Sequence, residues 1–249
     1  MTTTIFFSDE QLSQIQKARI PLHVAIIPDG NRRWAKKHKK LQFKGHKAGA
    51  ANIIEIVKAG KAIGIKALTF YLFSTENWNR SKDEVAALMW LLKKFLKDNC
   101  KEMQEQGVRL KTIGDSNTLP IDVLAVVEET IKATADCSGI DMVLALNYGS
   151  RDEIRRTFHC ILDRYSEGTL KKEEVTEKLI ASYLDTKPWG DPDLLIRTSG
   201  EKRISNFLLW QLSYSEIYFT ELFWPEFKPI DLLEAVLDFQ KRERRLGGT

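Results

Sequence analysis

The sequence predicts an α/β fold in which one domain is built on a mainly parallel six-stranded sheet with helices on both faces. Short apolar runs alternate along the chain with longer segments whose apolar residues recur at helical spacing, and this alternation is typical of parallel sheets. The 249 residues contain no internal repeat and no linker rich in Pro, Gly or Ser, and α/β domains reach ~250 residues as one unit. We therefore expect one domain over residues 21–249, preceded by a mobile segment over residues 1–20.

The predicted strands are short apolar runs that end at turn residues. The first, residues 24–27, stops at Pro28-Asp29-Gly30 and has the continuous apolar character of a strand buried on both faces. The remaining strands are expected over residues 65–73, 108–113, 142–146, 194–196 and 217–219.

The predicted helices follow from periodicity and from start and stop signals. One extends from Gly45 to the glycines at 60 and 64, and a long one begins after Ser81, whose spacing to Glu84 matches a capping box, and stops at Gly107. Ser150 and Glu153 repeat that spacing before a helix that ends near residue 165. Further helices are expected over residues 121–135, 171–184, 207–212 and 232–239.

Composition and charge exclude several classes of protein. The formal net charge of +4 is small for this length and argues against a dedicated nucleic-acid binder, so we expect no nucleic-acid partner. The three cysteines, Cys100, Cys137 and Cys160, form no CxxC pair and have no zinc spacing, which indicates reduced thiols in the cytosol. No apolar run reaches the ~18 residues of a membrane-spanning helix, and the first ten residues lack a signal-peptide core. We therefore expect a cytoplasmic protein.

Polar side chains collect where the predicted strands end. Residues 29–33, 74–80, 147–151 and 197–203 supply arginines, glycines, amides, hydroxyls and an early aspartate. If the strands are parallel, these segments share one edge of the sheet, where ligands of such folds bind. Arginine forks, close backbone approach at glycine and a carboxylate for Mg²⁺ together suit a diphosphate.

Each of these features alone has an ordinary structural interpretation. Gly30-Asn31 is typical of a tight turn, a strand-end arginine is typical of a solvated charge, and a lone histidine such as His46 is more often structural than catalytic. The sequence also lacks the GxxxxGK[ST], GxGxxG, GxSxG and HExxH motifs, which argues against the common nucleotide, hydrolase and zinc sites.

Six longer motifs resemble those of a known family. Residues 23–35 read HVAIIPDGNRRWA, residues 45–49 GHKAG and residues 73–80 FSTENWNR. Residues 193–201 read DLLIRTSGE, residues 203–211 RISNFLLWQ and residues 214–219 YSEIYF. In this order they resemble the signatures of the cis-prenyltransferases, and within that family the bacterial undecaprenyl diphosphate synthases.

The resemblance implies an enzyme that repeatedly joins isopentenyl diphosphate, in cis geometry, to an allylic diphosphate such as farnesyl diphosphate. It implies a long polyprenyl diphosphate product, undecaprenyl diphosphate for a cell-wall lipid carrier, with a shorter chain as the alternative. It further implies Mg²⁺ as cofactor, a homodimer, a hydrophobic tunnel in each subunit and peripheral contact with the inner face of the membrane for product release.

The resemblance also assigns roles to residues. Asp29 is expected to be catalytic as a Mg²⁺ ligand, and Glu216 to be a second metal ligand. Asn77 occupies the position of the family's proposed proton acceptor, but an amide is a poor base and a diphosphate oxygen is an equal alternative. The implied substrate-binding residues are Gly30, Asn31, Arg32, Arg33, Trp34, His46, Ser74, Thr75, Glu76, Trp78, Arg80, Arg197, Arg203, Ile204 and Ser205.

Tunnel walls are expected from residues 70–73 and from the apolar face of the helix after Ser81, although ordinary core packing explains any one of these residues equally well. Three positions depart from the family pattern. Leu72 stands where relatives often have alanine, which would narrow the tunnel and shorten the product. Gln42 stands where relatives often have arginine, and Lys202 where some have a metal-binding histidine.

Two further expectations concern the tail and rival functions. Residues 244–249 resemble the family's terminal Arg-x-Gly, which reaches the isopentenyl site across the dimer. We favour this interpretation over a solvated basic end, because glycines so close to a terminus serve no capping need. A non-catalytic family member would lack the aspartate and the Asn–Trp–Arg residues, whereas Asp29, Asn77, Trp78 and Arg80 are all present.

Overall fold

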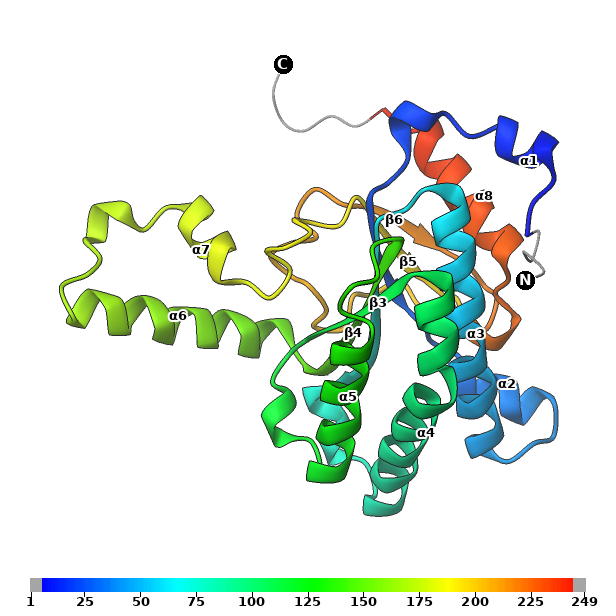
Figure 1. Cartoon of the computed structure of the whole chain (residues 1–249), viewed down its shortest axis with the longest axis horizontal. Coiled ribbons are helices and arrows are strands. Elements are labelled where there is room, and N and C mark those ends of the chain that lie inside the picture. Colours follow the sequence, from blue (N-terminus) through cyan, green and yellow to red (C-terminus); the bar gives the residue numbers. More distant parts are fainter. Residues whose placement is uncertain (1–5, 244–249) are drawn as a thin grey trace.

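In the computed structural model, which describes residues 6–243, six strands form one parallel sheet in the order β3-β4-β2-β1-β5-β6 (Figure 1). The strands are β1 (His23–Ile27), β2 (Ala67–Ser74), β3 (Val108–Ile113), β4 (Ile140–Tyr148), β5 (Leu194–Arg197) and β6 (Glu216–Phe219). The predicted single-domain α/β fold and its six parallel strands are confirmed.

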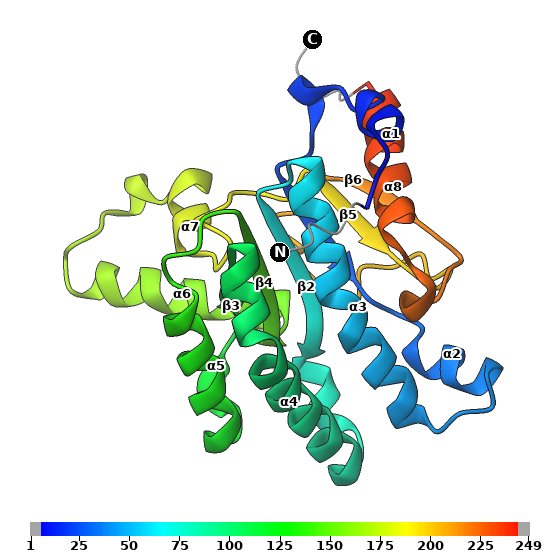
Figure 2. The ribbon, with the colours of Figure 1, turned by 45° about the vertical axis from the view of Figure 1, so that its right-hand side comes forward.

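The helices are α1 (Asp9–Ser13), α2 (Asn31–Lys37), α3 (Gln42–Ile63), α4 (Lys82–Gln106), α5 (Ile121–Ala133), α6 (Ser150–Ser166), α7 (Glu177–Tyr183) and α8 (Pro229–Lys241). Helices α3, α4 and α5 cover one face of the sheet together with α8, whereas α6 and α7 extend away from the sheet (Figures 1 and 2). Among residues 6–243, no helix is both long and apolar enough to cross a bilayer.

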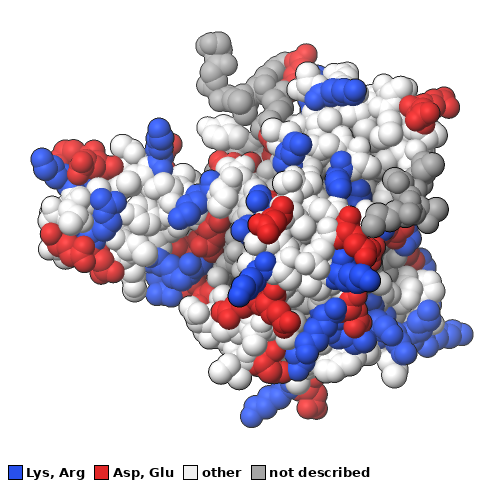
Figure 3. All heavy atoms as spheres, in the orientation of Figure 1, with Lys and Arg blue, Asp and Glu red and all other residues white. Residues whose placement is uncertain are grey.

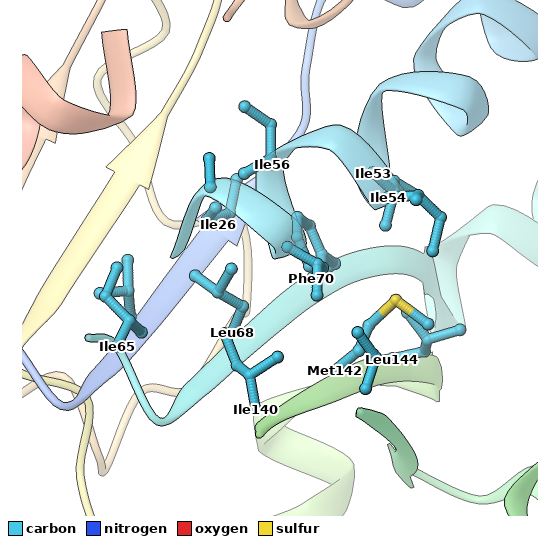
Figure 4. Packing of buried hydrophobic residues seen from close by; sticks show 14 of the residues in the cluster. Ile26, Ile53, Ile54, Ile56, Ile65, Leu68, Phe70, Ile140, Met142 and Leu144 are labelled. Carbon is cyan, nitrogen blue, oxygen red and sulfur yellow. The ribbon is translucent and has the colours of Figure 1, made fainter. Parts of the chain in front are cut away.

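The main hydrophobic core lies between the sheet and α3. Ile26, Leu68 and Phe70 project from the strands toward Ile53 and Ile56 of α3 (Figure 4), and all five are buried. Strands β1 and β4 are buried along their whole length, as expected for central strands covered on both faces. Burial of this apolar surface, at roughly 25 cal/mol per Å², fixes the register of the sheet and so the position of the strand ends.

The second face of the sheet is covered by the irregular segment that follows β5, in place of the helices predicted for that face. Phe207 and Leu208 are buried there, and the Phe207 ring stacks on Tyr71 of β2 with the ring centroids 4.4 Å apart. The predicted helix over residues 207–212 is wrong, because this segment forms turns with positive φ at Ser205, Asn206 and Leu208. Packing of its apolar side chains onto the sheet overrides the local helical pattern.

Both predicted helix starts are present, but only one of the two predicted caps is confirmed. The Ser81 hydroxyl accepts a hydrogen bond from the Glu84 N–H at 3.3 Å, but the Glu84 carboxylate binds Arg32 and Arg80 in place of the cap backbone. Ser150 is not a cap: it is the first residue of α6, and its hydroxyl accepts from the Leu209 N–H at 2.8 Å. The predicted helix over residues 171–184 is shorter, because a 3-10 turn (Lys172–Glu174) precedes α7.

Residues 6–20 of the predicted N-terminal segment lie against the domain. Phe7 is buried in the main core, and the side chain of Gln240 on α8 exchanges two 3.0 Å hydrogen bonds with the backbone of Gln16. The mobility and separate status of residues 1–20 stay predictions.

Candidate active site

The predicted meeting of strand ends is present in the structure. Asp29 follows β1, Ser74 ends β2 and Arg197 ends β5, so the three lie at the carboxyl edge of the parallel sheet. A cavity of about 810 Å³ opens at this edge. Of the predicted site residues, those that line it are Asp29, Gly30, Asn31, Arg32, Arg33, His46, Ser74, Glu76, Asn77, Arg80 and Ser205.

Asp29 sits at the centre of the charged contacts. Its Oδ2 accepts a hydrogen bond from Nη2 of Arg197 at 2.9 Å, and its Oδ1 accepts from the Gly30 N–H at 2.6 Å. Burial raises the pKa of Asp29, but these hydrogen bonds and the charges of Arg197 and Arg33 outweigh burial, so the pKa lies below its ordinary value. Asp29 is therefore a carboxylate at neutral pH.

Arg197 links Asp29 to the segment after β5. Its side chain is only 4% exposed, and Nη1 donates to the hydroxyl of Ser205 at 2.9 Å and to the carbonyl of Arg203. Its Nε is buried without a hydrogen-bond partner among residues 6–243. One guanidinium thus fixes the turn that carries two other predicted site residues.

Two further arginines converge on the same edge. Arg33 lies 3.4 Å from Oδ1 of Asp29 and donates to Glu201 at 2.8 Å, and Arg203 also pairs with Glu201. Both guanidinium groups are substantially exposed, so these pairs are weak and can rearrange around an anion.

Two glycines of α3 bring His46 to this edge. A Cβ on Gly45 would lie 2.0 Å from the carbonyl oxygen of Asn31, and a Cβ on Gly49 would lie 2.2 Å from its side-chain oxygen. Only glycine therefore lets α3 pack this closely against the beginning of α2. The GHKAG motif has a steric origin, and its consequence is that His46 lines the cavity.

The electrostatic environment keeps His46 neutral. Burial, reinforced by the charges of Arg80 and Arg32, lowers its pKa to about 4. Its Nε2 is buried without a hydrogen-bond partner among the described residues. A polar ring atom with no partner beside a cluster of arginines is consistent with a site for an anionic group.

The turn after β2 is held by its own side chains. Ser74 N–H donates to Oδ1 of Asn77 at 3.3 Å, and Trp78 Nε1 donates to Oδ1 of Asn147 at 2.7 Å. Arg80 pairs with Glu84 at 2.8 Å. These contacts hold Asn77 and Arg80 at the cavity wall.

Asn206 is a site residue that the sequence did not single out. Its side chain donates to Glu76 at 2.7 Å and accepts from the Arg151 N–H at 3.0 Å, so it joins three strand exits. Burial raises the pKa of Glu76, but the hydrogen bonds from Asn206, Ser74, Thr75 and the Glu76 backbone together hold it below its ordinary value. The position of Asn206 next to Ser205 in the RISNF motif is the only sequence signal for this role.

The inner part of the cavity is apolar. Its walls come from β2, α3 and α4, and include Ile53, Leu72, Phe73, Leu88, Met89, Leu91, Leu92 and Phe95. The register between β2 and β4 shifts between Tyr71 and Phe73, so Leu72 and Phe73 both pack on the helix-covered face. The predicted walls are largely confirmed, but Phe70 and Val85 belong to the core and do not line the cavity.

Comparison with known proteins identifies the family. Residues 27–247 match the family model described as "Putative undecaprenyl diphosphate synthase". The chain belongs to the undecaprenyl diphosphate synthase family of cis-prenyltransferases. It is 45% identical to the isoprenyl transferase of Bacillus cereus over 96% of this chain and 93% of the relative, and 45% identical to that of Bacillus subtilis over 94% and 90%.

Solved structures agree with this membership. The lavandulyl diphosphate synthase of Lavandula x intermedia, in complex with dimethylallyl diphosphate, superposes with a TM-score of 0.90 at 35% identity, covering 93% of this chain and 100% of that one. A probable undecaprenyl diphosphate synthase of Campylobacter jejuni gives 0.76 at 32% identity, covering 92% and 99%. The protein is a prenyltransferase enzyme of isoprenoid biosynthesis.

Several predicted site residues of this prenyltransferase do not line the cavity. Arg197 donates a hydrogen bond to Ser205 and Trp78 donates one to Asn147, whereas Arg203 is paired with Glu201. The other predicted residues that do not line the cavity are Trp34, Thr75 and Ile204.

The structure does not bring Glu216 to Asp29 within one chain. Glu216 begins β6, pairs in register with Leu194 and lies at the amino edge of the sheet, whereas Asp29 lies at the carboxyl edge. Its carboxylate is bound by Arg242 at 2.8 Å. Glu216 therefore does not reach Asp29 within one chain, and its role as a second metal ligand stays a prediction.

Members of this family generally require a divalent metal. No group of three or more His, Cys, Asp or Glu side chains with metal-binding geometry occurs within residues 6–243. Mg²⁺, however, is commonly held by one or two carboxylates together with substrate phosphates and water. Asp29, ionised and 31% exposed at the cavity, fits that coordination.

Proposed function

We propose that this prenyltransferase condenses isopentenyl diphosphate repeatedly with an allylic diphosphate, farnesyl diphosphate, to form a long polyprenyl diphosphate. The observation that carries the proposal is the cavity itself, because one end holds Asp29 among arginines and the other is lined by apolar side chains. A substrate with a diphosphate head and a hydrocarbon tail matches both ends.

The allylic diphosphate is proposed to bind at the beginning of α2. The first hydrogen bond of this helix joins the Trp34 N–H to the Gly30 carbonyl. The N–H groups of Asn31, Arg32 and Arg33 therefore have no acceptor within the helix and point toward its open end. Arg33 and the unpartnered Nε2 of His46 lie at the same end of the cavity. The tail then extends between β2 and the helices α3 and α4.

Isopentenyl diphosphate is proposed to bind at the turn after β5. Ser205 lines the cavity, Arg197 holds its hydroxyl, and the exposed guanidinium of Arg203 is free to turn toward a phosphate. Ser74, Glu76 and Arg80 lie between the two diphosphate positions. Thr75, Trp78, Trp34 and Ile204 do not line the cavity, and their substrate-binding roles stay predictions.

In each condensation the allylic C1–O bond breaks, the isopentenyl C4 bonds to C1, and a proton leaves the isopentenyl C2. Mg²⁺ held by Asp29 would neutralise charge on the departing diphosphate. Oδ1 of Asn77 already accepts from the Ser74 N–H, and an amide is a poor base. A diphosphate oxygen is therefore the proposed proton acceptor, and Asn77 orients the isopentenyl group.

The proposed product is undecaprenyl diphosphate, which serves as precursor of a cell-wall lipid carrier. Leu72 in the cavity wall is the observation that favours a shorter product as the second candidate. The similar structure that contains dimethylallyl diphosphate supports an allylic diphosphate as the substrate class.

Condensation assays test this proposal. Purified protein is incubated with labelled isopentenyl diphosphate, Mg²⁺ and allylic diphosphates of increasing length, and products are dephosphorylated and sized by mass spectrometry. Incorporation that depends on both substrates and on Mg²⁺ supports the proposal, and its absence with every starter contradicts it.

A homodimer is also proposed. Phe158, Leu162 and Tyr165 form one face of α6 at helical spacing, and each is more than half exposed. Burial of this stripe in a second subunit would remove it from water. Sedimentation of wild type and Leu162→Glu tests the dimer, since the variant should be monomeric. The proposed location is the cytoplasm, at the inner face of the membrane.

A further inference from the structure

A basic surface surrounds the connection between α2 and α3. From residue 30 to residue 54 the sequence contains no aspartate or glutamate. Arg32, Arg33 and Lys37 are paired with carboxylates from elsewhere in the chain. The other five lysines of residues 30–54 form no ion pair with any residue that the structure describes, and we name this set the α2–α3 surface: Lys36, Lys39, Lys40, Lys44 and Lys47.

Apolar side chains project from the same surface. Leu41, between these lysines, is 76% exposed. Trp90 of α4 is 48% exposed and packs beside Phe43, with the ring centroids 5.6 Å apart. The segment protrudes at the edge of the molecule, beyond α3 (Figure 2), and Lys and Arg side chains gather over it (Figure 3). Lysines around exposed leucine and tryptophan are the pattern that binds an anionic lipid interface.

A second cavity lies beside this surface and adjoins the main cavity. It has a volume of about 490 Å³, lies between α3 and α4, and is lined by Lys47 and Trp90 at its surface. It shares Ala50, Leu91 and Phe95 with the wall of the main cavity. Only these shared side chains therefore need to move for the apolar end of the main cavity to open beside the α2–α3 surface.

The carboxylates around the second cavity do not cancel the basic charge of the α2–α3 surface. Glu55 lies 3.4 Å from Lys228, Asp98 2.8 Å from Lys94, and Glu102 3.0 Å from Lys58. Each acid has a lysine partner outside the α2–α3 surface, so the five lysines of that surface retain their positive charge for an external anion.

We propose that the α2–α3 surface docks the enzyme on a bilayer rich in anionic lipids, with Leu41 and Trp90 inserted, and that the polyprenyl product leaves between α3 and α4 into that bilayer. The inference rests on the proposed function, because only a lipid product needs such an exit. Five cationic side chains around an apolar tip match a negatively charged, greasy surface better than a rigid protein partner.

Vesicle flotation tests the docking surface directly. Phosphatidylcholine vesicles with and without phosphatidylglycerol are compared at low and high salt, using wild type and the combined variant Lys36→Glu, Lys39→Glu, Lys44→Glu. Wild type should bind only the anionic vesicles and be released by salt. The variant should bind at least tenfold more weakly, since each lysine near such a surface contributes severalfold.

A matched control carries the same charge change on another face. This control combines Lys172→Glu, Lys178→Glu and Lys187→Glu, three exposed positions in and around α7. It should bind anionic vesicles as strongly as wild type does. Leu41→Ser should weaken binding without changing net charge. Equal binding of neutral and anionic vesicles, or equal loss in both triple variants, overturns the proposal.

The release step gives a second readout. Anionic vesicles should accelerate multiple turnover by wild type, and should not accelerate the α2–α3 variant, while both condense equally well in detergent. If the variant loses self-association or nucleic-acid binding and keeps its vesicle binding, the surface serves another partner and the proposal is wrong. Absence of condensation in detergent by wild type, with vesicle binding intact, contradicts the proposed function alone.

Discussion

The carboxylate of Asp29 and the guanidinium of Arg197 lie 2.9 Å apart, although 168 residues separate them in the chain. The contact exists because β1 and β5 are parallel neighbours, with Ile27 opposite Arg197. Arg197 is almost fully buried and holds the Ser205 turn, so Asp29 stabilises a buried charge while it faces the cavity. The same pair thus connects the proposed metal position to the proposed isopentenyl position.

Replacing Asp29 with asparagine should lower kcat by about 10²–10³, the range for loss of one preorganised electrostatic group at a reacting centre. Loss of the carboxylate also leaves Arg197 without its counter-charge, which should lower the free energy of unfolding by about 3 kcal/mol. Steady-state kinetics with Mg²⁺ and urea unfolding measure the two effects. The control Asp122→Asn removes an exposed carboxylate on α5 and should change neither. Near-wild-type turnover by Asp29→Asn would refute the central role of Asp29.

Asn206 should set the affinity for isopentenyl diphosphate without touching the reacting atoms. Asn206→Ala removes the hydrogen bonds to Glu76 and Arg151, and it also strains a residue whose φ is 63°. We expect the KM for isopentenyl diphosphate to rise about tenfold while kcat changes little, because one or two hydrogen bonds are lost. Asn206→Gly separates the two causes, since glycine relieves the backbone strain. Recovery of the wild-type KM in Asn206→Gly would show that only the backbone matters.

The sequence was sufficient for the sheet and for the polar ends of its strands. Continuous apolar runs fix β1 and β4 as central strands, and parallel strands necessarily end at one edge, which places Asp29, Ser74 and Arg197 together. This part of the candidate site follows from local pattern and topology, so it could be predicted.

The remaining features depend on contacts between distant segments. Ser150 has the spacing of a cap, yet its hydroxyl accepts a hydrogen bond from the Leu209 N–H. Residues 207–212 have a helical pattern, yet they form turns because their apolar side chains pack on the sheet. Asn206 bridges Glu76 and Arg151 only because three loops meet. Glu216 lies at the opposite edge from Asp29 because β6 enters the sheet in parallel register. No local signal encodes these relationships, whereas the predicted roles of residues 244–249 lie outside the described residues.

The stability of the protein should fall as the pH falls from neutral, in part through His23. Burial lowers the pKa of His23 to about 4, although the Gly190 carbonyl and Asp193 oppose this. The unfolded chain therefore binds this proton near pH 6.5 and the folded protein only near pH 4, so stability is complete above pH 6.5 and is lost below it. Between about pH 7.5 and about pH 5, His23 should account for a loss of about 2 kcal/mol.

Urea unfolding of wild type and His23→Gln at both pH values measures this contribution. The variant is less stable at neutral pH, because it loses contacts to Gly190 and Thr69. Its stability should nevertheless fall by about 2 kcal/mol less on acidification. An identical decrease in the two proteins would show that His23 does not titrate with folding.

Leu72 should limit the length of the product. It lies at the register shift between β2 and β4, lines the cavity opposite α4, and its truncation to alanine enlarges the apolar end where the chain grows. We expect Leu72→Ala to lengthen the product by at least one isoprene unit, measured by mass spectrometry after dephosphorylation. Because Leu72 faces an existing cavity, its loss should destabilise the fold by only about 1 kcal/mol.

Leu68, on the same strand, supplies the matched control for Leu72. Leu68 is fully buried in the main core and does not line the cavity. Leu68→Ala removes the same atoms, and should cost about 2–5 kcal/mol of stability while leaving product length unchanged. The two substitutions therefore have opposite signatures, one on product length and the other on stability. Product of wild-type length from Leu72→Ala, or equal lengthening by Leu68→Ala, would show that this wall does not measure the chain.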